Sequence, residues 1–433
     1  MSVDEIEVYG FDTINNDLRI VPIKKNQRGE RTNGTAQYTV SETDGVVSLP
    51  FHYALSKNFS STRDENIDIK YLTTLRDYQV EPINKAFELL QRTSCAFLDL
   101  RAGFGKTVIS AKISVMVGLR VFVLIKSKNL ISQWKNTFLK HTTATVYVFE
   151  TNKPNAYKGE DVVIVMAGRV SKMPENIKMR VGLLIVDEAD TFLCKTGISS
   201  ILSFTPEKVL YQTATPERED MMHLAFDSLV GTEKVWVARN KPFTYYCFST
   251  NIKITREFDS SGNVIWAEVV KQISENEERN NMIVDYAFKM HISKTLILSR
   301  GIDHSILLSD LCAKRYEAIH NKKDHSDYIA GNKSKFRDCP FYAGTISKIG
   351  RGFDLSSQLG EGTKDIDHVI IVHSIASKNP IEQVFGRGTR CENPRITMFV
   401  DIDKAINRHS KTVIDWCNSN GCKSIVYLTP STY

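Results

Sequence analysis

Glycine, lysine and threonine residues that could bind a phosphate lie together in one short stretch of the chain. The stretch consists of Gly103, Phe104, Gly105, Lys106 and Thr107. Glycines let backbone N–H groups approach phosphates, a lysine neutralises the β- and γ-phosphates, and a hydroxyl can bind magnesium. The full pattern has another glycine five positions before Gly105, where this chain has Leu100. A nucleoside triphosphate site is therefore one interpretation, and a glycine-rich turn before a buried helix is the other.

Carboxylates follow an apolar run further along the chain. Asp187, Glu188 and Asp190 come directly after or close behind the run at residues 183–186. Carboxylates at the end of a buried strand are costly unless a cation meets them. Magnesium that bridges β- and γ-phosphates is the natural partner, and a solvated turn after the strand is the alternative. Together with the glycine stretch, these acids favour ATP and Mg²⁺ as ligands.

Short apolar runs rich in β-branched residues indicate the elements that would position these groups. One series lies at 95–98, 121–125, 162–166, 183–186 and 208–211, and a second lies at 295–298, 369–372 and 396–400. Such unbroken runs are typical of strands covered on both faces, and the spacing leaves room for crossover helices. The sequence therefore predicts an α/β protein with two parallel-sheet lobes. The stretch 103–107 falls between a predicted strand and a helical pattern, as a phosphate loop requires.

The chain length also indicates several domains. At 433 residues the chain exceeds the size at which one hydrophobic core keeps growing. We expect a small β-rich accessory domain at residues 1–75, where alternating stretches are separated by polar turns, a first lobe at 76–240 and a second lobe at 241–433. Residues 237–281 look polar and irregular, and we expect a linker and the beginning of the second lobe there.

Composition and charge exclude several classes of protein. Hydrophobic residues make up 42% and charged residues 24% of the chain, which argues against a disordered or fibrous protein. The net charge of +6 favours a polyanionic partner only weakly. The eight cysteines contain no C-x-x-C pair, the N-terminus is acidic, and no apolar run is long enough to span a membrane. A protein of a reducing, cytoplasmic compartment with no membrane partner is the expectation.

A series of motifs over residues 75–400 resembles, in order, those of superfamily 2 helicases and translocases. In the first lobe, L-R-x-Y-Q lies at 75–79, Walker A at 103–107, Walker B at 187–190 and T-A-T-P-x-R-x-D at 213–220. The strand-phosphate motif L-V-P-T-x-x-L corresponds to 124–130, running on to Gln133 and Trp134, with Lys126 in place of proline. In the second lobe, Thr345 with Gly352, Phe353 and Asp354 resembles the fifth motif, and residues 383–390 match Q-x-x-G-R-x-x-R.

The resemblance implies two RecA-like lobes that hydrolyse ATP with Mg²⁺. Thr107 and Asp187 would hold the metal, Lys106 the phosphates, and Glu188 would orient and deprotonate the attacking water. Arg387 and Arg390 would act as arginine fingers from the second lobe, reaching the phosphates only when the lobes close. The L-R-x-Y-Q motif would lie on the adenine side of the nucleotide, where Gln79 would read the adenine edge. The nucleotide contacts implied by the resemblance, besides those above, come from Arg76, Gln79, Gly103, Phe104, Gly105, Gly352, Asp354 and Gln383.

The resemblance also implies a nucleic-acid strand lying across both lobes. Its phosphates would meet Lys126, Ser127 and Lys128 of the first lobe and Thr345 of the second, and such contacts should depend on salt. Thr213 and Thr215 would couple the ATP site to the strand. For Lys128 a solvated helix-cap cation is the alternative. Base stacking by Trp134 is less favoured than a core position, because the residue has Leu130 and Phe138 at helical spacing.

The spelling of the motifs is more similar to the DNA-acting branch than to RNA-unwinding proteins. That branch includes repair and transcription helicases, phage recombination helicases and helicases of large cytoplasmic DNA viruses of the poxvirus transcript-release type. Residues 187–190 read D-E-A-D, but Thr213-Ala214-Thr215 replaces the S-A-T of the RNA family. The resemblance implies a DNA-dependent ATPase, in the host cytoplasm or a virion if viral, with RNA polymerase or another transcription or repair factor as partner. An RNA-dependent ATPase, a hydrolysis-deficient binding module and a restriction-type motor subunit are the alternatives.

Overall fold

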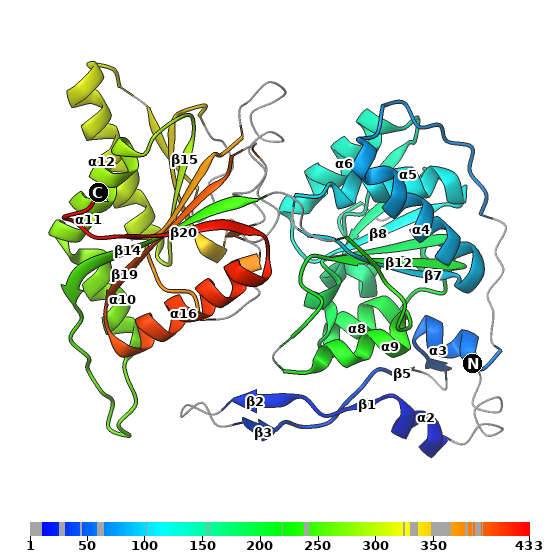
Figure 1. Cartoon of the computed structure of the whole chain (residues 1–433). Helices are drawn as coiled ribbons and strands as arrows, with labels where there is room; N and C mark the ends of the chain where they lie inside the picture. Colours follow the sequence, from blue (N-terminus) through cyan, green and yellow to red (C-terminus); the bar gives the residue numbers. More distant parts are fainter. Residues whose placement is uncertain are drawn as a thin grey trace. The chain divides into compact units, whose positions relative to one another are not determined.

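The chain is divided into two compact units, Met1–Val237 and Ala238–Tyr433. The computed structural model describes residues 11–25, 31–43, 46–58, 65–101, 103–153, 156–218, 220–237, 242–323, 325–329, 337–347, 365–376, 380–382, 384–385, 391 and 393–433. Each unit contains one seven-stranded parallel sheet. Figure 1 shows helices packed on each sheet. The predicted α/β class with two parallel-sheet lobes is therefore confirmed. None of the helices in the described ranges has the length and apolar character that crossing a bilayer requires.

The sheet of the first unit has the strand order β13-β7-β12-β11-β8-β10-β9. Its five central strands are the five apolar runs of the sequence: β7 (Cys95–Asp99), β8 (Val121–Ile125), β10 (Val162–Met166), β11 (Leu183–Asp187) and β12 (Lys208–Thr213). The two edge strands, β9 (Val146–Val148) and β13 (Val235–Trp236), were not predicted. They are too short to produce an apolar run, so the sequence pattern does not reveal them.

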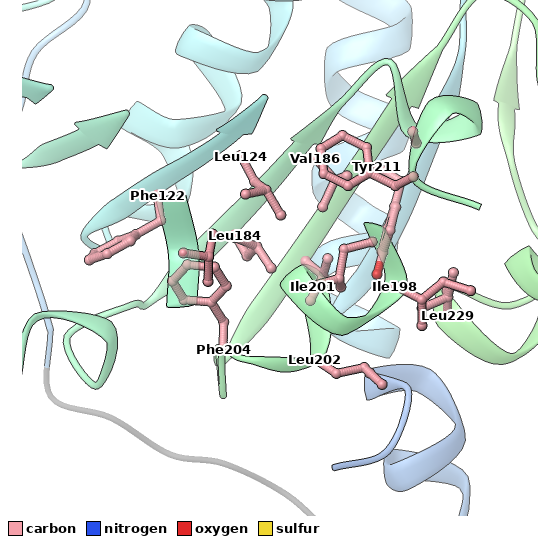
Figure 2. Packing of buried hydrophobic residues seen from close by; sticks show 14 of the residues in the cluster. Phe122, Leu124, Leu184, Val186, Ile198, Ile201, Leu202, Phe204, Tyr211 and Leu229 are labelled. Atoms are coloured by element: carbon pink, nitrogen blue, oxygen red, sulfur yellow. The ribbon is translucent and has the colours of Figure 1, made fainter. Parts of the chain in front are cut away.

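Both faces of this sheet are covered by helices, which explains why its strands read as unbroken apolar runs. On one face, side chains of β8 and β11 such as Phe122 and Val186 pack with α8 (Lys195–Leu202) and α9 (Ala225–Leu229), as Figure 2 shows. On the other face, Val121 and Val123 pack in a second core with α4 (Asp77–Thr93), α5 (Lys106–Val117) and α6 (Asn129–His141). The shorter helical segments of this lobe are η2 (Ala167–Lys172), α7 (Glu175–Lys178), η3 (Ala189–Phe192) and η4 (Met222–Leu224).

The N-terminal region contains strands, as predicted, and also two helices. Three antiparallel pairs join β1 (Arg19–Ile20) to β4 (Gln37–Tyr38), β2 (Ile23–Lys25) to β3 (Arg31–Asn33), and β5 (Ser41–Thr43) to β6 (Val46–Ser48). The helices are α2 (Phe11–Asp17) and α3 (Phe51–Ser56). Residues 65–71 then run along the first lobe, where the Arg120 N–H donates to the Glu65 carbonyl at 2.7 Å.

The second unit has the strand order β16-β17-β15-β18-β19-β14-β20. The three predicted runs form β15 (Thr295–Ser299), β18 (His368–Ile371) and β19 (Arg395–Ile402). Four strands were not predicted: β14 (Phe243–Lys253), β16 (Ser326–Ile329), β17 (Phe341–Thr345) and β20 (Cys422–Leu428). The helices described in full are α10 (Trp266–Glu275), α11 (Glu277–Lys289), α12 (Ile302–His320) and α16 (Lys404–Ser419).

The expectation of an irregular segment at residues 237–281 was wrong for most of its length. Strand β14 runs through it between β19 and β20, and α10 and the start of α11 follow. The strand was missed because buried positions alternate with polar ones along part of it, so that Thr244 and Ser249 interrupt any apolar run. The polar turn is real, since the Asp259 carboxylate accepts hydrogen bonds from the N–H groups of Ser261 and Asn263, both at 2.9 Å.

Candidate nucleotide site and strand-contact loops

The phosphate-binding stretch forms the loop between β7 and α5. Gly103 and Gly105 have φ angles of 82° and 91°, in the left-handed region where glycine is favoured. Helix α5 begins at Lys106, so its free N–H groups and the positive end of its dipole lie at the loop. Leu100, which replaces the first glycine of the pattern, is fully buried and its N–H donates to the Thr213 carbonyl at 3.2 Å. The loop therefore uses glycine only at its two left-handed positions, and Leu100 serves as a core residue.

The Lys106 ammonium group stays within its own loop. Its Nζ donates to the Leu100 carbonyl at 3.0 Å. Nearby, Asp99 at the end of β7 forms an ion pair of 2.9 Å with Lys234. Burial raises the pKa of Asp99, and the charges of Lys234 and Lys106 act in the opposite direction. An anionic phosphate is a stronger hydrogen-bond acceptor than a backbone carbonyl. Lys106 could therefore exchange the Leu100 carbonyl for a phosphate oxygen when a nucleotide binds.

Gln79 connects the L-R-x-Y-Q motif to this loop. Its Oε1 accepts a hydrogen bond from the Arg76 N–H at 3.1 Å, and its Nε2 donates to the Phe104 carbonyl at 3.3 Å. The guanidinium of Arg76 donates to the Tyr78 hydroxyl at 2.8 Å, and the Tyr78 and Phe104 rings meet edge to face. The structure therefore brings the predicted adenine-side residues, Arg76 and Gln79, next to the phosphate loop.

Asp187, at the end of β11, lies in a buried polar network. Its Oδ1 accepts hydrogen bonds from Gln212 Nε2 at 2.6 Å and from the Glu188 N–H at 3.0 Å. Its Oδ2 accepts one from Trp134 Nε1 at 2.7 Å. Thr107, on the first turn of α5, accepts a hydrogen bond from Gln133 Nε2 at 3.0 Å. The hydroxyl and the carboxylate that the sequence assigned to magnesium are thus both held by residues of α6.

Glu188 has an unusual backbone conformation. Its φ and ψ angles are 52° and 53°, the left-handed helical region that residues other than glycine rarely adopt. Backbone strain of this kind concentrates at functional sites, where the surrounding structure enforces it. The residue expected to activate water is therefore held in a strained turn between β11 and η3.

Asp190 belongs to a separate set of contacts. It is buried, and burial raises the pKa of its carboxyl although the Thr213 hydroxyl donates to it. Arg218 donates to the Asp190 carbonyl at 2.9 Å and forms an ion pair with Asp220. The Thr215 N–H donates to the Thr213 hydroxyl at 3.1 Å. Of the two threonines expected to have a coupling role, Thr213 therefore joins the T-A-T-P segment to the D-E-A-D segment, and Thr215 contacts Thr213.

The predicted strand-contact residues of the first lobe differ in their surroundings. The Lys126 ammonium donates to the Thr191 carbonyl at 2.5 Å and lies 3.3 Å from the Cys194 sulfur. Ser127 is half-buried and Lys128 is exposed directly before α6. Trp134 is fully buried, so the core position is confirmed and base stacking by this residue is excluded in this conformation.

In the second unit, the structure describes only part of the predicted site. Thr345 is buried at the end of β17. Gly352, Asp354, Gln383, Arg387 and Arg390 lie outside the described residues. Their nucleotide and arginine-finger roles stay predictions.

The comparisons with known proteins identify the family. The family model described as "Type III restriction enzyme, res subunit" matches residues 72–218, the part of the chain that holds the site. The protein named "Putative helicase 109L" from Invertebrate iridescent virus 3 is 32% identical over 221 residues, which cover 47% of this chain and 67% of that protein. This chain belongs to the superfamily 2 helicases.

Further relatives of this helicase extend over more of its length. "Putative helicase 161L" of Invertebrate iridescent virus 6 is 24% identical over 412 residues, covering 89% of this chain and 90% of the relative. "Transcript termination protein A18" of Yaba-like disease virus is 21% identical over 373 residues, covering 80% and 76%. A fragment assigned as the HsdR subunit of a type I restriction enzyme from Vibrio vulnificus has the same fold, with a TM-score of 0.60 at 15% identity over 98% of this chain and 81% of that one. As a superfamily 2 helicase, the protein uses a nucleoside triphosphate and binds nucleic acid.

Sequence reasoning missed the hydrogen-bonding residues around Thr107 and Asp187, the two residues predicted to bind magnesium. Gln133 and Trp134 were noted as the end of a motif, without a partner. Their contacts depend on how α6 is rotated over the sheet, which no sequence pattern reports. Gln212 did carry a signal, because a glutamine near the end of a buried strand requires hydrogen-bond partners. The Gln212 amide donates to the Asp187 carboxylate, and its Oε1 accepts a hydrogen bond from the Ser110 hydroxyl at 2.6 Å.

Proposed function

We propose that this helicase is a DNA-dependent ATPase that uses Mg²⁺ and converts hydrolysis into movement along DNA. The observation that carries the nucleotide part is that two consecutive residues of α6 hydrogen-bond to Thr107, which follows Lys106 on α5, and to Asp187 at the end of β11. A hydroxyl and a carboxylate are oxygen donors of the kind Mg²⁺ prefers, and it usually binds through one or two of them together with nucleotide phosphates. The residues present therefore fit this ion.

Each residue of the first lobe has a distinct part in the proposed reaction. The loop N–H groups and Lys106 bind and orient the β- and γ-phosphates, while Gln79 holds the loop from the adenine side. Glu188 orients the attacking water and accepts its proton. A bound Mg²⁺ supplies neutralisation of the charge that develops on the phosphate oxygens. Arg387 and Arg390 complete the site from the second lobe in this proposal.

Ser127 and Lys128 are proposed to contact the backbone of a nucleic-acid strand, together with Thr345. The exposure of Lys128 before α6 supports this role. A different role is supported for Lys126, because its ammonium group already donates a hydrogen bond to the Thr191 carbonyl. We propose that Lys126 joins the strand-contact loop to the segment behind the D-E-A-D residues. Contacts to phosphates carry no sequence information, so binding should be insensitive to sequence and weaken with salt.

Two features support DNA over RNA as the polymer. The third motif reads T-A-T-P-x-R, and Arg218 connects it to Asp190. Among the relatives are poxvirus proteins named for transcript termination, and the matching family model is named for a restriction enzyme. We therefore propose a role in releasing transcripts or remodelling DNA, with RNA polymerase or a repair factor as partner. An RNA-dependent ATPase is the second candidate, since the ATP site would be the same.

Steady-state ATP hydrolysis separates these candidates. The purified protein is assayed without polymer and with single-stranded DNA, duplex DNA or RNA, and Lys106→Ala serves as the blank. Stimulation by DNA alone supports the proposal, and the stimulation should fall as salt rises. Stimulation by RNA alone would assign the second candidate. Hydrolysis equal to that of the Lys106→Ala blank under all conditions would refute the ATPase assignment.

A further inference from the structure

Helix α6 places two consecutive side chains on the two proposed magnesium ligands. Gln133 Nε2 donates to the Thr107 hydroxyl oxygen at 3.0 Å, and Trp134 Nε1 donates to Asp187 Oδ2 at 2.7 Å. We infer that Gln133 and Trp134 are positioning residues for Mg²⁺, which fix the ligand atoms of Thr107 and Asp187 before the ion arrives. The inference rests on the proposed function of those two residues as metal ligands.

The hydrogen bonds of Asp187 determine which of its oxygens is available to a metal. A carboxylate oxygen can accept about two hydrogen bonds. Oδ1 already accepts two, from Gln212 and from the Glu188 N–H. Oδ2 accepts one, from Trp134. Oδ2 is therefore the oxygen with a remaining lone pair for Mg²⁺ or a water bound to it, and the indole N–H sets its direction.

The same reasoning applies to Thr107. A hydroxyl oxygen has two acceptor lone pairs, and its proton rotates freely unless a partner holds it. Gln133 occupies one lone pair through its amide N–H. The second lone pair then remains available to a metal. Without Gln133, the hydroxyl could rotate to the geometry of an ordinary donor.

The surroundings of Trp134 make it a rigid donor. The side chain is fully buried, and its ring stacks on Phe138 with ring centroids 5.9 Å apart. Leu130 and Phe138, one helical turn away on either side, are also buried, so α6 presents a packed face. Groups that orient a metal ligand typically change metal affinity or activity 10- to 100-fold when they are removed. An immobile indole next to Asp187 fits that role.

The test uses two variants that remove one donor each: Trp134→Phe, which keeps an aromatic ring, and Gln133→Met, which keeps the length of an unbranched side chain. Matched controls in the second unit remove the same chemical groups: Trp416→Phe, whose indole donates to Glu382 at 3.1 Å, and Gln272→Met, whose amide donates to the Thr255 carbonyl at 2.8 Å. Binding of a fluorescent ADP is measured in EDTA and then during titration with Mg²⁺. Each test variant should need about 10- to 100-fold more Mg²⁺ for the half-maximal change. Affinity for metal-free ADP should stay within about twofold of wild type, as it should for both controls.

The outcomes distinguish the inference from the proposed function. An unchanged Mg²⁺ requirement in both test variants would overturn the inference while leaving the nucleotide site intact. An equal loss of affinity with and without Mg²⁺ would also overturn it, because the residues would then support the loop and not the ion. Wild-type protein that binds the nucleotide without any response to Mg²⁺ would instead refute the metal site itself.

Discussion

The strained backbone at Glu188 leads to a prediction in which substitutions change the stability of the protein and its ATPase activity independently. The perturbation is a pair of substitutions, Glu188→Gly and Glu188→Ala, which both remove the carboxylate. Both variants should lose hydrolysis, since neither can accept a proton from water. They differ in how well the new residue tolerates φ and ψ angles of 52° and 53° and in the freedom that it has in the unfolded chain. The difference in stability between the two variants is therefore the backbone strain reduced by the unfolded-chain entropy of glycine.

The magnitude follows from the conformation. An L-residue in the left-handed region costs about 1–2 kcal/mol, and glycine avoids this cost. Glycine gains additional freedom in the unfolded chain, which costs roughly 0.5–1 kcal/mol. The glycine variant should then be more stable than the alanine variant by about 1 kcal/mol. For a domain of the size of this first unit, that corresponds to a difference of about 2–4 °C in unfolding temperature.

Thermal unfolding of the full chain, followed by calorimetry, tests this difference. The matched control is the same pair at Glu88, an exposed position within α4. There alanine should be more stable than glycine by about 1 kcal/mol, the opposite order. An alanine variant at 188 as stable as the glycine variant, or more stable, would refute the strain argument. Glu188→Gln keeps the shape of the side chain and should bind ATP without turnover; retained turnover would remove Glu188 from its proposed role.

Three further predictions concern Gly105 in the phosphate loop, the Glu65 ion pair of the first lobe, and Arg390 of the second lobe. Gly105→Ala should weaken ATP binding at least about tenfold in a fluorescence titration. The left-handed φ costs alanine about 1–2 kcal/mol, and the new Cβ would lie 2.5 Å from Gln79 Nε2. An unchanged affinity would contradict the loop geometry. Glu65→Gln should lower the unfolding free energy by about 2 kcal/mol at neutral pH, because Glu65 pairs with Arg120 at 2.8 Å. Burial alone would raise the pKa of Glu65, but its arginine hydrogen bonds and the arginine charges outweigh this and lower it. The difference from wild type should therefore begin to shrink below the usual value of 4.5 and disappear as pH falls through the lowered pKa. A difference that persists in acid would refute the ion pair. Arg390→Ala should lower kcat about 10³- to 10⁵-fold without changing the unfolding transition, and an unchanged rate would remove its finger assignment.

The strands at the centres of the two sheets could be predicted because burial on both faces imposes a continuous apolar run. The run at 121–125 shows why: Phe122 and Val123 point to opposite cores, so every position must be apolar. Strand β14 follows a different rule along part of its length, with buried and less buried positions alternating. Strand β9, at the sheet edge, is too short for either pattern. One-sided burial or short length therefore removes the signal from these two strands. Strand β17 is buried at every position and was missed for another reason, because its sequence, Phe-Tyr-Ala-Gly-Thr, is poor in β-branched apolar residues.

The sequence proposes the candidate site as a set of residues, but it does not report the contacts between them. The glycines at 103 and 105 were identifiable from local chemistry, and their left-handed backbone agrees with it. The contacts of Lys126 could not be predicted, because its partner Thr191 lies 65 residues further along the chain. Trp134 was correctly expected in the core by its helical spacing. Its hydrogen bond to Asp187 depends on three-dimensional packing that spacing alone does not contain.

The contacts of strand β12 suggest how the two halves of the first-lobe site communicate. Gln212 lies opposite Asp187 in the parallel register of β11 and β12, and its side chain binds the Asp187 carboxylate. Thr213 is the next residue, so its side chain points to the opposite face of the sheet, where its hydroxyl binds Asp190. The end of β12 thus contacts the proposed metal ligand, Asp187, on one face of the sheet. On the other face it contacts Asp190, to which Arg218 also donates. A small displacement of β12 must disturb both sets of hydrogen bonds together, because consecutive residues carry them. This short connection is a sufficient physical basis for the coupling role that we propose for Thr213, and it requires no longer pathway through the lobe.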